Sequence, residues 1–83
     1  MSTQTKLSAI EQHVVDFVTE LRSTHQLTQE NIAVIIGVGR SFVAKVEDRK
    51  HHAKYNLNHI DKLADHFGMS PRDFLPEKPN KHM

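Results

Sequence analysis

The sequence predicts an all-α fold of five short helices joined by short connections. Apolar residues recur at the three- and four-residue intervals of amphipathic helices in successive stretches of the chain. Residues that start and stop helices separate these stretches: Ser8, Thr28 and Asn56 suit N-caps, and Gly37 and Gly68 suit helix ends. No stretch alternates apolar and polar residues as a half-buried strand does, and no segment is repeated.

Length and composition indicate one small domain. The chain has 83 residues, of which 37% are apolar and 25% charged, a balance typical of a folded domain rather than a disordered one. It has no cysteine, which excludes disulfides and thiolate metal sites. No apolar run approaches the roughly 18 residues of a membrane span, and the N-terminus lacks the apolar core of a signal peptide. We therefore expect a cytoplasmic protein with no membrane contact.

The first helix is predicted to begin after Ser8, which opens an S-x-x-E capping box, and to end at about residues 23–24. Its apolar stripe consists of Ile10, Val14, Phe17, Val18 and Leu21. Val15 lies off this stripe and is expected to be half exposed. Residues 1–7 are expected to form a flexible leader.

Residues 27–49 are predicted to form two short helices joined by a tight turn. Thr28 caps the first of them, whose inner face repeats at helical spacing through Ile32, Ala33, Ile35 and Ile36. Gly37 supplies the positive φ that lets the chain leave this helix abruptly. Val43 and Val46 form the inner face of the second helix, whose outer face consists of Arg40, Ser41, Ala44 and Lys45. The second and third helices of the domain would thus form a helix-turn-helix.

After a polar loop over residues 48–55, a fourth helix is predicted between Asn56 and Gly68. Its expected buried face consists of Leu57, Ile60, Leu63, Ala64 and Phe67. Met69 follows the final glycine and is placed to pack back onto the helix.

A short fifth helix is predicted from the Ser-Pro-Arg-Asp sequence that starts at Ser70. This sequence has a Ser cap, Pro at the first helical position and Asp at the third. Phe74 and Leu75 are expected to insert into the core. The folded domain should span residues 8–75, and residues 76–83 should form a disordered tail.

Positive charge is concentrated in one part of the chain, although the net charge is only +1. Residues 40–54 contain five Lys or Arg against two Asp or Glu, whereas residues 1–39 contain two against four. His51 and His52 lie in the same basic segment. A local basic stripe of this kind is typical of contact with phosphates.

The helix-turn-helix resembles that of the phage-repressor and Cro-like (XRE-type) family, whose pattern reads roughly L-T-Q-x-x-L-A-x-x-x-G-V-S-x-x-x-I-S-x-x-E-x-G. The matching residues are Leu27, Thr28, Gln29, Ile32, Ala33, Gly37, Val38, Val43 and Glu47. The flanking helices extend the resemblance over roughly residues 8–75. It implies a compact, five-helix, lambda-repressor-like DNA-binding domain. Three departures stand in the pattern: Gly39 and Ala44 replace common serines, and Arg49 replaces a common glycine, which leaves open how the third helix ends.

The resemblance also implies which side chains contact DNA. The third helix, about residues 40–48, would lie in the major groove, with its outward residues on base edges: Arg40, Ser41, Ala44 and Lys45. Arg and Lys can pair with guanine, whereas Ala44 offers a methyl group alone. The helix N-terminus around Thr28 and Gln29 would contact the DNA backbone, as would the basic segment through Arg49, Lys50 and Lys54. Glu47 is expected to have a structural role, with Arg22 as a candidate partner.

Three apolar residues in the motif, Val34, Ile35 and Phe42, occupy positions that are usually polar or small in the family. They are either scattered exposed side chains of the ordinary kind or a small patch for a partner protein or a thymine methyl group.

The histidines and the polar residues do not predict a metal site, a cofactor or an enzyme. His51 and His52 are adjacent in a loop, and His59 and His66 are two helical turns apart, roughly 10 Å by helix rise. Structural zinc sites need four closed ligands. No nucleophile–base spacing, phosphate loop or paired carboxylates are evident.

The sequence thus favours a sequence-specific regulator of transcription, most simply a repressor, that binds double-stranded DNA. One recognition helix covers few base pairs, so we expect a homodimer on an inverted repeat. The fifth helix with the tail, and the first helix, are both candidates for the dimer surface. The alternative is a protein-interaction module, such as an antitoxin whose main partner is a toxin or another regulator, and a neighbouring toxin-like gene would favour it.

Overall fold

The computed structural model describes residues 7–79 of the chain. Over these residues it has four α-helices, one short 3₁₀ helix and no strand: α1 (Ala9–Thr24), α2 (Gln29–Ile36), α3 (Arg40–Glu47), α4 (Leu57–Phe67) and η1 (Pro71–Phe74). The predicted all-α class and the bounds of the first four helices are confirmed. Residues 1–6 and 80–83, which hold most of the predicted leader and half of the predicted tail, lie outside the described residues.

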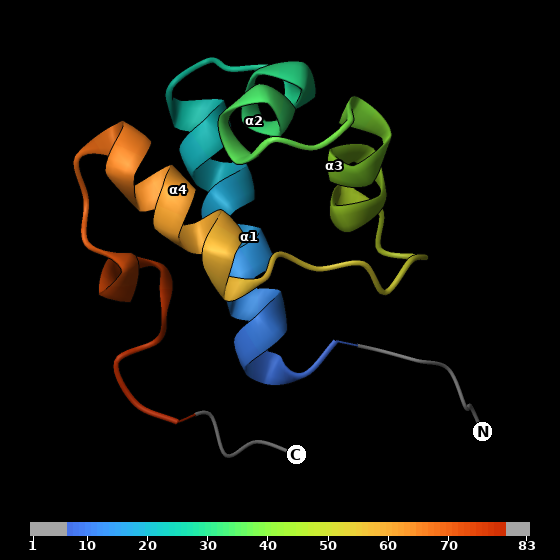
Figure 1. Ribbon diagram of the computed structural model, residues 1–83. Coiled ribbons are helices and arrows are strands. Elements are labelled where there is room, and N and C mark those ends of the chain that lie inside the picture. Colours follow the sequence, from blue (N-terminus) through green and yellow to red (C-terminus); the bar gives the residue numbers. More distant parts are fainter. Residues whose placement is uncertain (1–6, 80–83) are drawn as a thin grey trace.

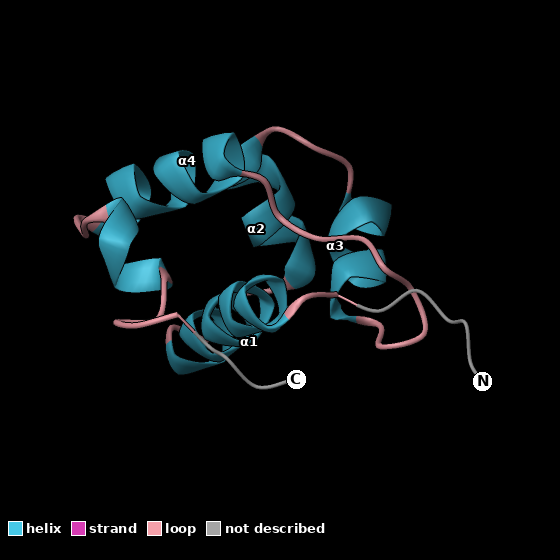
Figure 2. Ribbon diagram, turned by 90° about the horizontal axis from the view of Figure 1, so that it is seen from below, coloured by secondary structure: helices cyan, strands magenta, loops and turns pink. Residues whose placement is uncertain are grey.

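The helices surround one core. Figure 1 shows α2 above the middle of the molecule and α3 at its right-hand edge, and Figure 2 shows α1 and α4 on opposite sides of the interior. α3 packs mainly on α2 and also touches α1, whereas η1 packs on α4 and α1. This arrangement leaves one side of α3 facing outwards.

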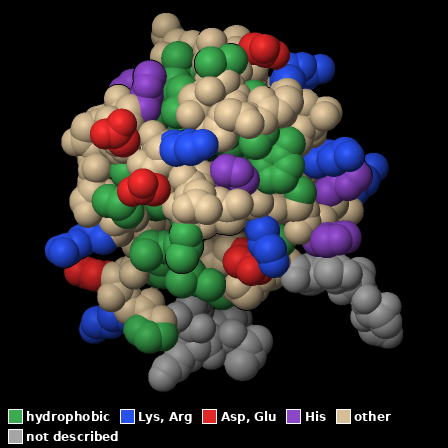
Figure 3. Space-filling model, viewed as in Figure 1, with side chains coloured by type: hydrophobic (Ala, Val, Ile, Leu, Met, Phe, Trp, Pro, Cys, Tyr) green, Lys and Arg blue, Asp and Glu red, His purple; other side chains and the backbone are tan. Residues whose placement is uncertain are grey.

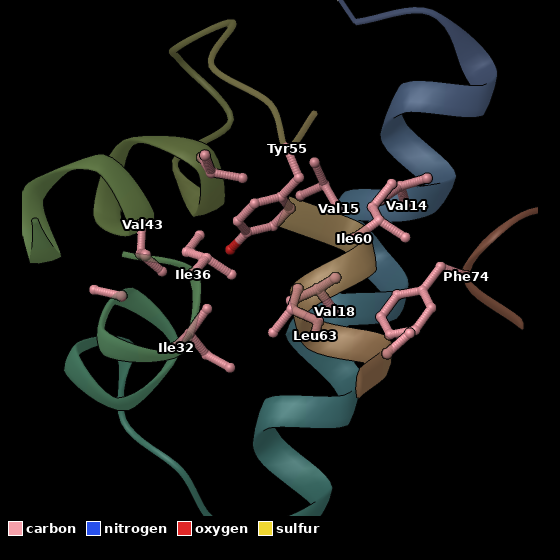
Figure 4. Packing of buried hydrophobic residues seen from close by; sticks show 13 residues of the cluster. Val14, Val15, Val18, Ile32, Ile36, Val43, Tyr55, Ile60, Leu63 and Phe74 are labelled. Carbon is pink, nitrogen blue, oxygen red and sulfur yellow. The ribbon is translucent and has the colours of Figure 1, made fainter. Parts of the chain in front are cut away.

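Every α-helix, the loop before α4 and η1 contribute to the core, which Figure 4 shows from close by. The buried hydrophobic residues are Val14, Val15, Val18, Ile32, Ala33, Ile36, Val43, Val46, Tyr55, Ile60, Leu63, Ala64 and Phe74. Leu7, which was expected in the leader, also packs partly against this cluster. The Tyr55 ring inserts between α3 and α4, and burial raises the pKa of its hydroxyl.

Three residues depart from the burial that helical periodicity predicts. Val15 is buried rather than half exposed, because α3 also packs against α1. Ile10 and Leu57, expected in the core, are 47% and 76% exposed. Both lie in the first turn of their helices, which extends past the neighbouring elements. Periodicity identifies the face of a helix, but it does not identify where the covering neighbour ends.

Local hydrogen bonds start and stop most of these helices. The N-caps Ser8, Thr28, Asn56 and Ser70 each form a reciprocal capping box with the residue three positions later. Gly37 and Gly68 end α2 and α4 at φ +77° and +67°, in the left-handed region that costs glycine least. After α1, Gln26 adopts this conformation at φ +57°.

The fifth predicted helix is not an α-helix. Pro71–Phe74 makes a single 3₁₀ turn, so five α-helices are not confirmed. Proline restricts the residue before it to extended conformations, and Leu75 before Pro76 accordingly has φ −111° and ψ +155°. The segment therefore has room for one turn. Phe74 is buried as expected, whereas Leu75 is 37% exposed.

The way in which α3 ends explains why position 49 does not need the glycine that is common in the family. The helix ends at Glu47, and Asp48 continues the chain in an extended conformation, at φ −92° and ψ +115°. Its N–H still donates to the carbonyl oxygen of Lys45, at 3.1 Å. Because no residue at this end adopts a positive φ, a side chain at Arg49 carries no backbone penalty.

His59 connects the start of α4 to α3. Its Nδ1 accepts a hydrogen bond from the N–H of Asn56 at 3.1 Å, and its ring packs edge-on against Phe42 at a centroid distance of 5.4 Å. Burial, together with the nearby charge of Lys62, lowers the pKa of His59 below its usual 6.5. A protonated ring could not accept the Asn56 hydrogen bond.

We therefore expect His59 to make stability fall on mild acidification. Between the ordinary His pKa of 6.5 and the lowered pKa of His59 in the folded state, the unfolded chain binds a proton that the folded chain does not. The contribution of His59 to the free energy of unfolding is therefore complete above pH 6.5 and decreases as the pH falls below it. His59→Gln keeps a capping acceptor that does not titrate. Urea unfolding of both proteins from about pH 8 to pH 5 should show that the free energy of unfolding falls less in the variant than in the wild type. Parallel pH profiles would show that His59 does not cause the loss of stability in acid.

Candidate nucleic-acid interface

The outward side of α3 is the exposed side of the helix-turn-helix. Val43 and Val46 are buried, so the positions between them face away from the core. Of the four residues predicted to contact bases, Arg40, Ser41 and Lys45 are exposed and Ala44 is half-buried. All four lie on one side of α3. Figure 3 shows Lys, Arg and His side chains gathered at the right-hand edge of the molecule, where α3 and the loop after it lie.

Glu47, the last residue of α3, connects the helix-turn-helix to α1. Its Oε2 accepts a hydrogen bond from Arg22 Nε at 2.9 Å, and its Oε1 accepts one from Arg22 Nη2 at 2.8 Å. Arg22 Nη1 also donates to the carbonyl oxygen of Leu27 at 2.9 Å. The expected pairing of Glu47 with Arg22 is confirmed. These bonds to Glu47 raise the pKa of Arg22 and connect α1, the start of α2 and α3.

Gln29 extends this network towards the outer surface. Its Nε2 donates to Glu47 Oε1 at 2.9 Å, and its Oε1 accepts a hydrogen bond from Arg40 Nη1 at 3.2 Å. Both contacts agree with the orientation of the Gln29 amide, because its NH₂ group faces the Glu47 carboxylate and its oxygen faces the Arg40 guanidinium. Arg40 is thereby held beside the N-terminus of α2, and one N–H of the Gln29 amide is already used inside the protein.

Thr28 has a capping role that leaves its hydroxyl hydrogen free. Its Oγ1 accepts from the N–H of Asn31 at 3.0 Å, and its own N–H donates to Asn31 Oδ1 at 2.9 Å. A hydroxyl that accepts one hydrogen bond can still donate another. Thr28 is exposed, so capping does not compete with a contact to a phosphate. The sequence pattern identified the Thr28 cap but not Asn31 as its reciprocal partner, although an Asn at this spacing could have indicated it.

Of the three cations that follow α3, two are paired with α1. Arg49 Nη2 lies 3.4 Å from Asp16 Oδ1, and Lys54 Nζ lies 2.9 Å from Glu11 Oε2. A backbone hydrogen bond from Ser8, followed by that from Lys54, lowers the pKa of Glu11. Exposed ion pairs of this type contribute only about 0–1 kcal/mol. Their loss to a phosphate would therefore cost little.

Lys50 and Lys45 take part in no ion pair with the residues that the structure describes. Both are exposed. The N–H of Lys50 donates to Asp48 Oδ1 at 2.9 Å, and His51 Nε2 lies 3.7 Å from Asp48 Oδ2, so Asp48 shapes the loop just beyond α3. Lys45 on the helix and Lys50 on the loop thus present free cations from two neighbouring elements.

The three apolar residues singled out in the motif do not form a common exposed patch. Val34 is 69% exposed, whereas Ile35 and Phe42 are partly buried against the core. The Phe42 ring packs edge-on against Tyr55 and His59. Phe42 therefore anchors α3 to the start of α4.

Metal-ligating residues do not cluster in residues 7–79: no three or more His, Cys, Asp or Glu side chains there are arranged to hold an ion. Within the same range, no helix has the length and apolar character needed to cross a membrane.

The chain was compared with known protein families, curated proteins and solved structures. No protein-family model matches the chain, and no curated protein matches it. Among solved structures, the chain is similar to the restriction-modification controller protein C.AhdI from Aeromonas hydrophila, with 32% sequence identity and a TM-score of 0.61. The match covers 76% of this chain and 92% of that one. The chain belongs to the phage-repressor and Cro-like helix-turn-helix family.

Proposed function

We propose that this protein is a sequence-specific regulator of transcription that binds double-stranded DNA. The observation that carries the proposal is the outward side of α3, where Arg40, Ser41 and Lys45 are exposed on a helix whose other side is fixed in the core. Such a helix can enter the major groove without any rearrangement of the domain. Arg40 and Lys45 would pair with guanine edges, and Ala44 would contact a thymine methyl group.

Contacts to the DNA backbone would set the position of α3 in the groove. Thr28 would donate its free hydroxyl hydrogen to a phosphate, and Gln29 would use the amide hydrogen that Glu47 does not take. Lys50 would bind a phosphate directly, whereas Arg49 and Lys54 would exchange their carboxylate partners on α1 for phosphates. Contacts of this kind supply affinity and salt dependence rather than base preference.

The simplest mode of action is repression by a cytoplasmic homodimer on an inverted repeat. One α3 reaches only a few base pairs, and a second copy doubles the contacts. The half-sites would then lie about one helical turn apart, roughly 34 Å.

In-vitro selection from a random duplex pool tests the proposal. We expect a palindromic consensus from the wild-type chain and none from Arg40→Ala/Lys45→Ala. A charge-matched control, Arg72→Ala/Lys78→Ala, removes two exposed cations that belong to neither α2 nor α3, and it should recover the wild-type consensus. No enrichment with the wild-type chain at low salt would overturn the proposal.

The genes that it regulates are suggested by the similarity to a restriction-modification controller. If the same role holds here, genes for a methyltransferase and an endonuclease should lie next to this one. The alternative, an antitoxin-like protein-interaction module, predicts a neighbouring toxin gene instead. The apolar residues that favoured it lend little support, since Ile35 and Phe42 pack against the core.

A further inference from the structure

We propose that Asp48 is a positioning residue for DNA binding: the hydrogen bond that its side chain accepts orders the turn after α3 and so strengthens the contacts of that turn with phosphates. This turn, which we call the basic turn, consists of residues 48–51. The proposal rests on the proposed function, which assigns Arg49 and Lys50 to the DNA backbone, and it adds the residue that holds them in place.

Three hydrogen bonds of Asp48 close the basic turn and join it to α3. Its backbone oxygen accepts the N–H of His51 at 2.9 Å, which makes Arg49 and Lys50 the two central residues of a β-turn. Its Oδ1 accepts the N–H of Lys50, also at 2.9 Å. Its own N–H donates to the carbonyl oxygen of Lys45 at 3.1 Å. A local bond from an Asp side chain to the backbone two residues on is a typical way to stabilise a turn.

The conformation of the basic turn allows both central residues to be cations. Neither Arg49 nor Lys50 has a positive φ, so a long side chain causes no backbone strain at either position. Both residues are exposed. In Figure 1 the chain that follows α3 reaches outwards at the right-hand edge of the molecule. The basic turn therefore carries two adjacent cations directly after the helix that is proposed to meet the bases.

The charge of Asp48 opposes the binding that its hydrogen bond favours. Its side chain is 45% exposed, and no Lys or Arg within residues 7–79 forms an ion pair with it. A carboxylate in this place repels phosphates. A turn that is already ordered, however, loses less conformational entropy when it contacts a phosphate. The two effects have opposite signs, so they can be separated only when the charge is held constant.

Asp48→Asn and Asp48→Ala hold the charge constant, because both are neutral and only asparagine keeps an oxygen that can accept the N–H of Lys50. Fluorescence anisotropy of the full chain with its selected duplex should show about 3–10-fold weaker binding for Asp48→Ala than for Asp48→Asn. Asp48→Asn should bind at least as tightly as the wild type. The ratio between the variants should persist for single-base changes in the site, because phosphate contacts carry no base preference. Equal affinities of the two variants would overturn the proposal.

A second comparison tests whether Asp48 acts through the cations of the basic turn. In the background Arg49→Ala/Lys50→Ala, the exchange of asparagine for alanine at position 48 should change the affinity by less than about twofold, because the turn then has no cation to position. A ratio as large as in the original background would show that Asp48 acts through the fold of the domain, and the proposal would be wrong.

Asp73 provides the matched control. Its Oδ2 accepts the N–H of Ser70 at 2.9 Å, so it is also an exposed carboxylate bound to a local backbone N–H. It belongs to η1, which packs on α4 and α1 and not on the helix-turn-helix. Asp73→Asn and Asp73→Ala should therefore bind DNA equally, and a difference as large as that at Asp48 would contradict the proposal. Thermal unfolding should confirm that every variant is folded at the temperature of the binding measurement.

Failure of this proposal is distinguishable from failure of the proposed function. If the wild type binds its selected duplex and the two Asp48 variants bind it equally, DNA recognition holds and Asp48 does not position the basic turn. If the wild type selects no consensus and binds no duplex at low salt, the proposed function fails and this proposal fails with it.

Discussion

Glu47→Ala is expected to lower the free energy of unfolding by about 2–4 kcal/mol, the largest single-residue effect on stability that we predict. Glu47 accepts three hydrogen bonds, two from Arg22 and one from Gln29. Its side chain is 10% exposed and that of Arg22 is 22% exposed. Removing the carboxylate leaves a guanidinium largely out of water without its partner. Because Arg22 keeps some solvent contact, the expected loss lies somewhat below that of a fully buried pair.

Urea unfolding measures this loss, and Asp16→Ala is the control. Asp16 belongs to the exposed pair with Arg49, at 3.4 Å, so its removal should cost no more than about 1 kcal/mol. Glu47→Gln should give an intermediate loss, because the amide can still accept hydrogen bonds but carries no charge. A Glu47→Ala protein as stable as the wild type would show that this network does not support the fold.

Lys45→Ala and Lys50→Ala are expected to weaken DNA binding in different ways. Loss of Lys45, on the outward side of α3, should relax the preference at one position of the site by about 1–3 kcal/mol. Loss of Lys50, in the loop after α3, should weaken binding to all sequences alike and reduce the salt slope by about one unit. Affinities for the selected site and for single-base variants, each measured at several salt concentrations, separate these effects.

Both lysines are exposed and make no ion pair with the described residues, so neither substitution should disturb the fold. Thermal unfolding of the two variants serves as the control. If both variants lose affinity equally and without regard to sequence, α3 does not present its outward side to the bases.

The parts of the structure that the sequence predicted well are those set by local chemistry. Ser8, Thr28 and Asn56 begin their helices because each finds its hydrogen-bond partners within one turn. Gly37 and Gly68 end helices because their own backbone preference decides the conformation. The outward side of α3 follows from the 3.6-residue period once Val43 and Val46 are assigned to the core.

The parts that it did not predict depend on neighbours distant in the chain. Ile10 and Leu57 continue the apolar stripes of their helices, yet none of the helices within residues 7–79 covers them fully. The contacts of Gln29 with Glu47 and Arg40 span 18 and 11 residues, and no local pattern encodes such separations. The ion pairs of Arg49 and Lys54 with α1 could not be predicted from the sequence either, because the packing of the helices determines which partners these long side chains can reach.

The N-terminus of α3 is capped differently from those of the other three α-helices. Gly39 provides no side-chain hydrogen bond there, whereas α1, α2 and α4 each begin with a capping box. With eight residues and no cap, α3 is too short to persist by itself in water. The contacts of Val43, Val46 and Glu47 with the rest of the domain stabilise this helix. The element proposed to meet the bases is thus held in place by its contacts with the rest of the domain rather than by a local cap.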